Sequence, residues 1–281
     1  MNSVSINGKI LSDLKPALLV SNRGYRYGDG LFETIKVING KIILESLHIE
    51  RLFNSLQVLK FKIPRLFTVE KIRNEILALA NKNRCSQLAR VRLSVFRGHG
   101  GLYENDKEKE PQYVIECWPL NESVNGLNEN GFVIDIYPIA RKSADIFSNL
   151  KTANFLPYAM AAIYAKENKL NECLVLNTAG NIADATIANI FIVKDGTILT
   201  PALSEGCVNG VMRKYLVKEL NKANQDVKES ILTENDIKNA DEIFLTNAIN
   251  GIRWVKQFRD KVYSNTRILE IYDHFIKGLN K

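Results

Sequence analysis

Asn-Gly dipeptides between apolar, β-branched runs are the feature that most restricts the folds open to this chain. Asn7-Gly8 separates Val4-Ser5-Ile6 from Lys9-Ile10-Leu11, and Asn39-Gly40 lies between two further strand-like runs. Both central residues of a type I′ turn need positive φ angles, which Asn and Gly adopt readily. Strands joined by such a turn are antiparallel neighbours. The sequence therefore predicts two β-hairpins close to the N-terminus.

The rest of the first half predicts two helices and two more strands. One helix is expected to begin near Ser46 and a second after Thr68, a favourable N-cap residue. Alternation of apolar and polar residues predicts strands over 88–96 and 112–118. The glycine-rich segment 23–30 precedes a strand instead of opening a helix, so it predicts a loop and not a dinucleotide-binding fingerprint. We therefore expect mostly antiparallel strands with two helices.

A polar segment, 121–130, is expected to link a smaller α+β domain, 1–120, to a larger domain, 131–281. A hairpin extension inside one domain is the alternative. The second half repeats the mixture of strands and helices. Expected strands cover 132–139, 173–176, 190–193, 198–199 and 242–246, and expected helices cover 156–168, 211–223 and 268–279. The fold class predicted is α+β or α/β with two domains.

Composition argues against several classes of function. The net charge of +7 would suit a nucleic-acid-binding protein, but the Lys and Arg residues are scattered among acidic ones and form no stripe. The four cysteines form no CxxC pair, and three dispersed histidines offer no metal-ligand spacing. Neither a signal-peptide pattern nor an apolar run of membrane length is present. We expect a cytoplasmic protein with reduced cysteines, no metal, and no nucleic-acid or membrane partner.

Residues that could carry chemistry gather between Leu150 and Arg213. A lysine, Lys151, is followed by an acidic residue, Asp184, and by the glycine-containing start of a helix at Val208-Asn209-Gly210-Val211. Neither a Gly-x-Ser-x-Gly elbow nor a Walker phosphate loop occurs. A single lysine is usually a solvated surface residue, so only the order of several motifs can identify this segment.

That order resembles the class IV aminotransferase family, the fold type IV pyridoxal-phosphate enzymes. This family holds branched-chain aminotransferases, D-amino-acid aminotransferases and 4-amino-4-deoxychorismate lyases. The matching positions are Asp184, Thr186, Asn189, Ile190-Phe191, Thr200 and Val208 to Arg213 in the second half, with Tyr27 to Thr34 and His48-x-x-Arg51-Leu52 in the first. The resemblance covers nearly the whole chain. It implies a D-amino-acid aminotransferase-like fold, an active site in the cleft between two domains, pyridoxal 5′-phosphate as cofactor, an amino-acid-like substrate and a homodimer.

The resemblance also implies how the cofactor would be held. Arg51 corresponds to the arginine that pairs with the cofactor phosphate, for which a guanidinium is well suited. Val211 and Met212 correspond to the helix start whose N–H groups face that phosphate. Asn189 is expected beside the cofactor ring, and Asn247-Ala248 is expected in the loop that closes the phosphate pocket.

Two residues have roles closer to the reaction. Lys151 corresponds to the lysine that bonds the cofactor aldehyde and later moves protons at the substrate α-carbon. Asp184 stands where the family normally has Glu, bonded to the ring nitrogen so that the ring accepts electrons. The shorter aspartate side chain raises the prospect of a shifted ring, a bridging water or a weaker protonation, and so of reduced transaminase activity.

Substrate-side motifs favour one branch of the family. Glu33 and Thr34 are expected to face the substrate, and a Thr at the second position resembles the lyases, which use a hydroxyl there. Asn247-Ala248 and the segment from Arg97 to Gly101 also resemble the lyase forms, and Arg97 is expected near the substrate. Leu102, in contrast, replaces an arginine found in a lyase version of that loop.

The leading hypothesis is therefore a 4-amino-4-deoxychorismate lyase. Lys151 would remove the α-proton, Thr34 would assist, and pyruvate would leave to give 4-aminobenzoate for the folate pathway. A branched-chain or D-amino-acid transaminase is the alternative. A third possibility is a pyridoxal-phosphate-binding protein whose catalysis is impaired by Asp184.

Overall fold

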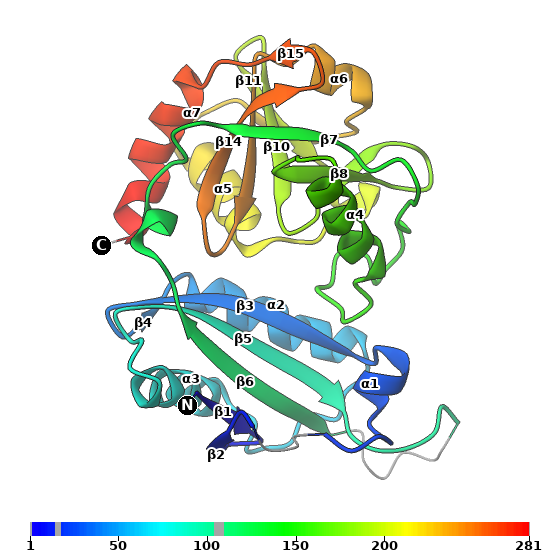
Figure 1. Ribbon diagram of the computed structural model, residues 1–281, viewed down its shortest axis with the longest axis vertical. Coiled ribbons are helices and arrows are strands. Elements are labelled where there is room, and N and C mark those ends of the chain that lie inside the picture. Colours follow the sequence, from blue (N-terminus) through cyan, green and yellow to red (C-terminus); the bar gives the residue numbers. More distant parts are fainter. Residues whose placement is uncertain (1, 15–17, 104–109, 281) are drawn as a thin grey trace. The chain divides into compact units, whose positions relative to one another are not determined.

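The computed structural model describes residues 2–14, 18–103 and 110–280, and it divides into two compact units (Figure 1). The first unit extends to Glu122 and also contains Leu150–Asn154, whereas the second contains Ser123–Asn149 and the chain from Phe155 onward. The predicted boundary assigned 150–154 to the second domain. These residues join the first unit because their backbone pairs with a strand of its sheet, as the bridge between Leu31 and Thr152 shows.

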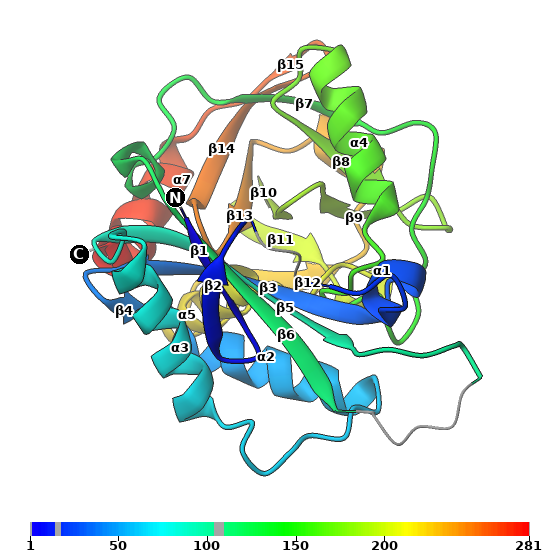
Figure 2. The same cartoon turned by 60° about the horizontal axis from the view of Figure 1, so that its bottom comes forward.

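A six-stranded antiparallel sheet with the order β2-β1-β6-β5-β3-β4 forms the first unit (Figure 2). Its strands are β1 (Ser3–Ile6), β2 (Lys9–Ser12), β3 (Gly30–Ile38), β4 (Lys41–Ile42), β5 (Leu88–Arg97) and β6 (Pro111–Pro119). Both predicted hairpins are confirmed. Asn39 and Gly40 have φ angles of 49° and 71°, as a type I′ turn requires. The second hairpin is shorter than expected, because Leu44 adopts a left-handed conformation and a helix begins at once.

Two helices, α2 (Glu45–Val58) and α3 (Val69–Lys82), bury their apolar sides against one face of this sheet. Thr68 caps α3 as predicted, since its side chain accepts a hydrogen bond from the Lys71 amide. The glycine-rich segment is not a plain loop. It contains a short helix, α1 (Arg23–Tyr27), which Asn22 caps at its start and Gly28, with a φ of 64°, ends.

The second unit is built on a nine-stranded mixed sheet with the order β12-β11-β10-β13-β14-β7-β8-β9, to which β15 adds beside β14. Its strands are β7 (Phe132–Ile136), β8 (Glu172–Leu176), β9 (Ile182–Ala185), β10 (Asn189–Lys194), β11 (Thr197–Pro201), β12 (Val227–Ser230), β13 (Glu242–Asn247), β14 (Gly251–Phe258) and β15 (Lys261–Val262). Four of them, β9, β12, β14 and β15, were not expected from the sequence. The β7–β8 and β7–β14 pairs are parallel, which matches the predicted mixed fold class.

Helices of the second unit are α4 (Leu156–Glu167), α5 (Val211–Lys222), α6 (Glu234–Lys238) and α7 (Thr266–Ile271), and α7 continues as η3 (Tyr272–Ile276) and η4 (Lys277–Asn280). Shorter 3₁₀ turns are η1 (Glu122–Asn125), inside the predicted linker, and η2 (Leu203–Glu205). Helix α4 packs on β8 through Tyr158 and Ala161. None of the helices in the described part of the chain is both long and apolar enough to span a bilayer.

Candidate active site

Lys151 is held against strand β3 in the first unit. The amide of Phe32 donates to the Lys151 carbonyl at 2.9 Å, and the amide of Ala153 donates to the Gly30 carbonyl at 2.9 Å. The Lys151 Nζ lies 4.6 Å from the centroid of the Phe32 ring, where an ammonium gains from the negative face of the ring. Lys151 is half-buried and its backbone is held against β3, so it is not a freely solvated surface residue.

Glu33 points to the opposite side of β3, toward helix α2. Its Oε2 atom is 2.7 Å from His48 Nδ1, and Arg51 donates from Nε to Oε1 at 2.7 Å and from Nη2 to Oε2 at 2.5 Å. Burial by itself would raise the pKa of Glu33. The Arg51 charge and the hydrogen bonds from His48 and Arg51 outweigh that effect and lower the pKa to about 2.

The expectation that Glu33 and Thr34 both face the substrate therefore needs correction. Successive residues of a strand point to opposite faces of a sheet, and Glu33 is buried in its pair with Arg51, with only 1% of its surface exposed. Thr34 shares the other face with Phe32. Arg51, the predicted phosphate ligand, is positioned by Glu33, and its contact with a phosphate stays a prediction.

Arg92 is a residue that sequence reasoning missed. It pairs with Thr34 across the β3–β5 ladder, its guanidinium carbon lies 3.8 Å from the Phe32 ring centroid, and its Nε donates to Ser94 Oγ at 3.1 Å. Burial lowers the pKa of Arg92. Within the described ranges no carboxylate lies at ion-pair distance from Arg92, although the charge of Glu116, opposite it in the β5–β6 ladder, acts against this lowering of the pKa. The alternation Arg90-Val91-Arg92-Leu93-Ser94 could have indicated that Arg92 faces away from the core.

Arg97, predicted near the substrate, is placed in a structural role. Its guanidinium donates to the Asp29 carboxylate and to the Leu59 carbonyl, and it stacks 4.4 Å from the Phe61 ring centroid. These contacts hold the end of β5 against the start of β3. The expected place of Arg97 near the substrate stays a prediction.

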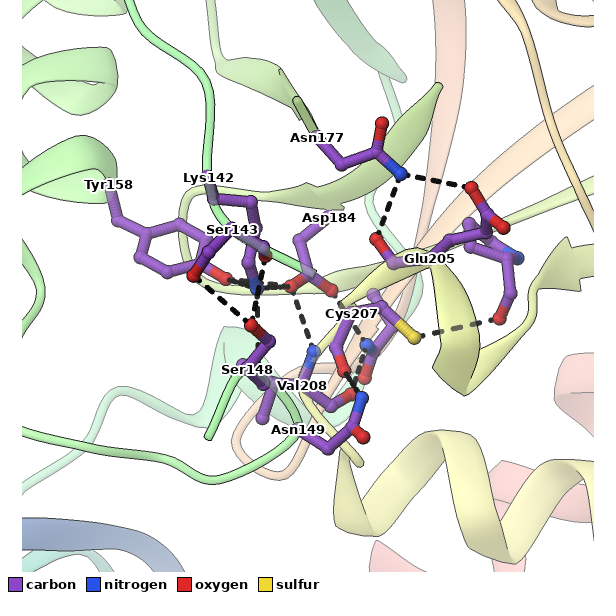
Figure 3. Close-up of polar contacts among 12 residues, drawn as sticks. Lys142, Ser143, Ser148, Asn149, Tyr158, Asn177, Asp184, Glu205, Cys207 and Val208 are labelled. Atoms are coloured by element: carbon purple, nitrogen blue, oxygen red, sulfur yellow. Dashed lines mark hydrogen bonds and ion pairs between the residues drawn. The ribbon is translucent and has the colours of Figure 1, made fainter. Parts of the chain in front are cut away.

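Asp184 lies on β9 in the second unit and is 2% exposed. Its Oδ2 atom accepts hydrogen bonds from Lys142 Nζ at 3.1 Å, Tyr158 OH at 2.7 Å and the Val208 amide at 2.9 Å (Figure 3). Its Oδ1 atom accepts from Asn189 Nδ2 at 2.9 Å. The predicted neighbours Asp184 and Asn189 are therefore brought together. Four donors on one carboxylate fix its position and orientation.

Lys142 and Tyr158 had no sequence signal that pointed to Asp184. Lys142 is 7% exposed, and its ammonium also donates to the Tyr158 oxygen and to the Ser148 carbonyl (Figure 3). Tyr158 comes from helix α4. Burial, reinforced by the Asp184 charge, raises the pKa of Tyr158 well above its ordinary value, so the hydroxyl stays protonated and donates. A buried ion pair 42 positions apart is a product of the tertiary fold.

Helix α5 begins beside Asn189, and its first turn lacks a side-chain cap. Gly210 occupies the N-cap position, and a Cβ atom there would lie 1.8 Å from Asn189 Oδ1, so this approach requires glycine. Val211 and Met212, each 3% exposed, form the first turn. Amide groups at a helix start attract anions.

The predicted loop at Asn247-Ala248 follows the strand paired with Asn189. Thr246, opposite Asn189 in the β10–β13 ladder, is 1% exposed, and its hydroxyl has no hydrogen-bond partner among the described residues. Asn247 Oδ1 accepts from the amides of Ile249 and Asn250 at 3.0 and 2.8 Å, which shapes a tight turn. A buried, unsatisfied hydroxyl is uncommon and usually indicates a missing partner.

Comparisons with known proteins agree with this geometry. A family model described as amino-transferase class IV matches residues 30–258. A protein of Methanocaldococcus jannaschii, provisionally named a branched-chain-amino-acid aminotransferase, is 29% identical over 270 residues, which cover 95% of this chain and 92% of that protein. An aminodeoxychorismate lyase of Vibrio harveyi is 25% identical over 234 residues, with 83% and 84% covered.

Among solved structures, the branched-chain aminotransferase of Thermoproteus uzoniensis with norvaline superposes with a TM-score of 0.87 at 21% identity, and the match covers 100% of this chain and 96% of that one. The fold predicted from the motifs is confirmed. The chain belongs to the class IV aminotransferase family and has the fold of its type IV pyridoxal-phosphate enzymes.

Proposed function

We propose that this protein is a pyridoxal-phosphate-dependent transaminase that acts on an amino acid and a carboxylate-bearing oxo acid. The observation that carries this proposal is the placement of Lys151, with its backbone bonded to β3 and its amine above Phe32. Lys151 would bond the cofactor aldehyde and remove the proton from the substrate α-carbon. Pyridoxal phosphate, which class IV aminotransferases use, would supply the electron-accepting ring when bound.

Groups of the second unit fit such a cofactor. Asp184 would hold the ring nitrogen, with Asn189 fixing the carboxylate. Val211 and Met212, at the uncapped start of α5, would donate their amides to the phosphate. The unsatisfied Thr246 hydroxyl, opposite Asn189, would gain a phosphate oxygen as its partner.

Further phosphate contacts are proposed for residues that match phosphate-binding positions of the family motif. Arg51 would pair with the phosphate dianion from a guanidinium that Glu33 already holds in place. Asn247 and Ala248 would close the phosphate side of the site. The donor set, an arginine, helix-start amides and hydroxyls, is the set that a phosphate prefers.

Arg92 favours a transaminase over a lyase. Its guanidinium lies on the same face of the sheet as Phe32 and Thr34. Glu116, opposite Arg92 in the β5–β6 ladder, acts on it through its charge, but among the described residues Arg92 has no ion-pair partner at contact distance. A second substrate carboxylate, as in a dicarboxylic amino acid, would supply that partner through two parallel hydrogen bonds. Arg97, the residue on which the lyase hypothesis partly rested, is committed to Asp29.

The lyase stays a second candidate because of one observation. The Thr34 side chain shares the Phe32 face of β3, where a hydroxyl could act on the substrate. The protein of Vibrio harveyi shows that relatives with a lyase name exist at comparable similarity. The homodimer expected from the family stays a prediction that sedimentation would test.

Two measurements test the proposal in order. Borohydride reduction of the protein with pyridoxal phosphate should add the cofactor mass to the peptide that contains Lys151, and Lys151→Ala should lose the addition. The wild type should then transfer an amino group to 2-oxoglutarate, and Arg92→Leu should raise KM for that acceptor by roughly ten- to a hundred-fold, the loss of a charged hydrogen-bonded pair. No labelled peptide would refute the cofactor assignment, and pyruvate release from aminodeoxychorismate without amino transfer would establish the lyase instead.

A further inference from the structure

Asp184 is unusually well supplied with hydrogen-bond donors. Each carboxylate oxygen offers about two acceptor sites, and Oδ2 already accepts from Lys142, Tyr158 and the Val208 amide. Among the residues that the structure describes, Oδ1 accepts from Asn189 alone. Only Oδ1 therefore retains acceptor capacity for a further donor, and the carboxylate that would face a ring nitrogen already has a cation as its partner.

Among the described residues, the charges of this cluster sum to zero when Asp184 itself is included. Two titratable groups contact Asp184 directly: Lys142, from the segment after β7, and Tyr158, from α4. Around the neighbouring Cys207 lie two further charged groups, Arg213 from α5 and Glu229 from β12. Burial raises the pKa of Tyr158, and burial together with the Asp184 charge raises the pKa of Cys207 to about 12, so both stay neutral. Arg213 is paired with Glu229 at 2.7 Å.

The remaining charges are the ammonium of Lys142 and the carboxylate of Asp184. Lys142 is 7% and Asp184 2% exposed, so solvent screens their interaction only slightly. A proton added to a ring nitrogen at Asp184 would leave one uncompensated positive charge in this buried cluster. Without the Lys142 charge, the positive charge of the protonated ring nitrogen would cancel the negative charge of Asp184. The ring nitrogen would then bind its proton more tightly.

We propose that Lys142 is a positioning residue that cancels the charge of Asp184 and thereby lowers the proton affinity of the cofactor ring nitrogen. This inference rests on the proposed function, in which Asp184 holds that nitrogen. The Lys142 ammonium and the Tyr158 hydroxyl both donate to Oδ2 of Asp184, so Oδ1 is the atom that would face the ring nitrogen. The neighbouring cation would make the ring less readily protonated and so a weaker electron acceptor.

Nitrogen NMR of the holoenzyme loaded with pyridoxal phosphate labelled at its ring nitrogen tests the proposal, because the nitrogen signal moves when the ring is protonated. In the wild type the signal should titrate within the pH range in which the protein stays folded. In Lys142→Met the protonation midpoint should rise by one pH unit or more, about a ten-fold gain in proton affinity. Lys142→Arg, which keeps the charge, should stay near the wild type.

Tyr158→Phe is the matched control, since it removes a hydrogen bond to the same Oδ2 atom without removing a charge. A shift as large as that of Lys142→Met would overturn the charge argument, as would identical titrations of Lys142→Met and wild type. If Lys142→Met does not fold, the wild type still decides: a ring nitrogen that stays protonated throughout the folded pH range refutes the proposal. Absence of labelled cofactor on Lys151 would instead refute the proposed function.

Discussion

The buried pair of Glu33 and Arg51 should make the stability of the first unit depend on pH in a defined window. The pKa of Glu33 falls from 4.5 to about 2 on folding. At about 1.4 kcal/mol per pH unit, that fall corresponds to about 3 kcal/mol. The Glu33 and Arg51 side chains are only 2% and 11% exposed, so screening by solvent removes little of it.

The sign follows from linkage. A carboxylate whose folded pKa is below its unfolded value stabilises the fold fully above pH 4.5, and this contribution is lost as the pH falls toward 2. Glu33→Gln cannot ionise and leaves Arg51 without its counter-charge. We therefore expect the variant to be less stable than the wild type by about 3 kcal/mol at neutral pH, and the difference to shrink through that window.

Urea unfolding followed by circular dichroism, without cofactor, measures this difference at neutral pH and at several acidic values. Glu167→Gln, an exposed carboxylate at the end of α4, is the matched control and should change stability by less than about 0.5 kcal/mol at every pH. A Glu33→Gln difference that stays constant from neutral to acidic pH would refute the linkage argument. So would a difference below about 1 kcal/mol at neutral pH.

Three further predictions concern the second unit. Gly210→Ala should destabilise this unit by about 1–3 kcal/mol in thermal unfolding, because the new methyl group would overlap Asn189 Oδ1. Gly126→Ala is the control and should leave the stability nearly unchanged, because a Cβ there meets nothing within 4 Å. Thr246→Val should leave the cofactor-free protein as stable as the wild type or slightly more stable, since it removes an unsatisfied buried hydroxyl, yet weaken cofactor binding in a fluorescence titration. Phe191→Ala should cost about 3–5 kcal/mol in urea unfolding, because the Phe191 ring is fully buried and stacked 4.9 Å from a neighbouring ring.

Local signals predicted the parts of the fold that depend on local geometry. The turn at Asn39-Gly40 could be located because those two residue types supply the φ angles by themselves. Helix α3 could be placed because the Thr68 cap and the apolar spacing agree. Helix α1 was missed because Gly24 within it is a poor helix former, and the helix is held by Asn22 and by the Gly98 carbonyl that accepts from the Arg23 amide.

Within the site, the order of motifs indicated which positions carry polar or charged residues, but it did not predict the direction or the partners of their side chains. The motif places both Glu33 and Thr34 toward the substrate, although alternation along a strand allows only one of two successive residues on that face. Arg97 matched a lyase motif by sequence, yet Asp29 and Leu59 take up its guanidinium. A motif fixes residue types at positions, whereas the role of a charge depends on partners that only the tertiary fold supplies.

Asp184 shows where that limit has a chemical consequence. From the sequence alone, the aspartate differed from the family glutamate by one methylene, and the expected results of that shorter reach were a shifted ring, a bridging water or a weaker protonation. The structure adds a cation, Lys142, to the same carboxylate. Reach and charge are separate effects, because a longer carboxylate with Lys142 in place would still face the ring as half of a neutral pair. Asp184→Glu should therefore change how tightly the cofactor is held more than it changes the protonation of the ring nitrogen, whereas removal of the Lys142 charge should do the reverse.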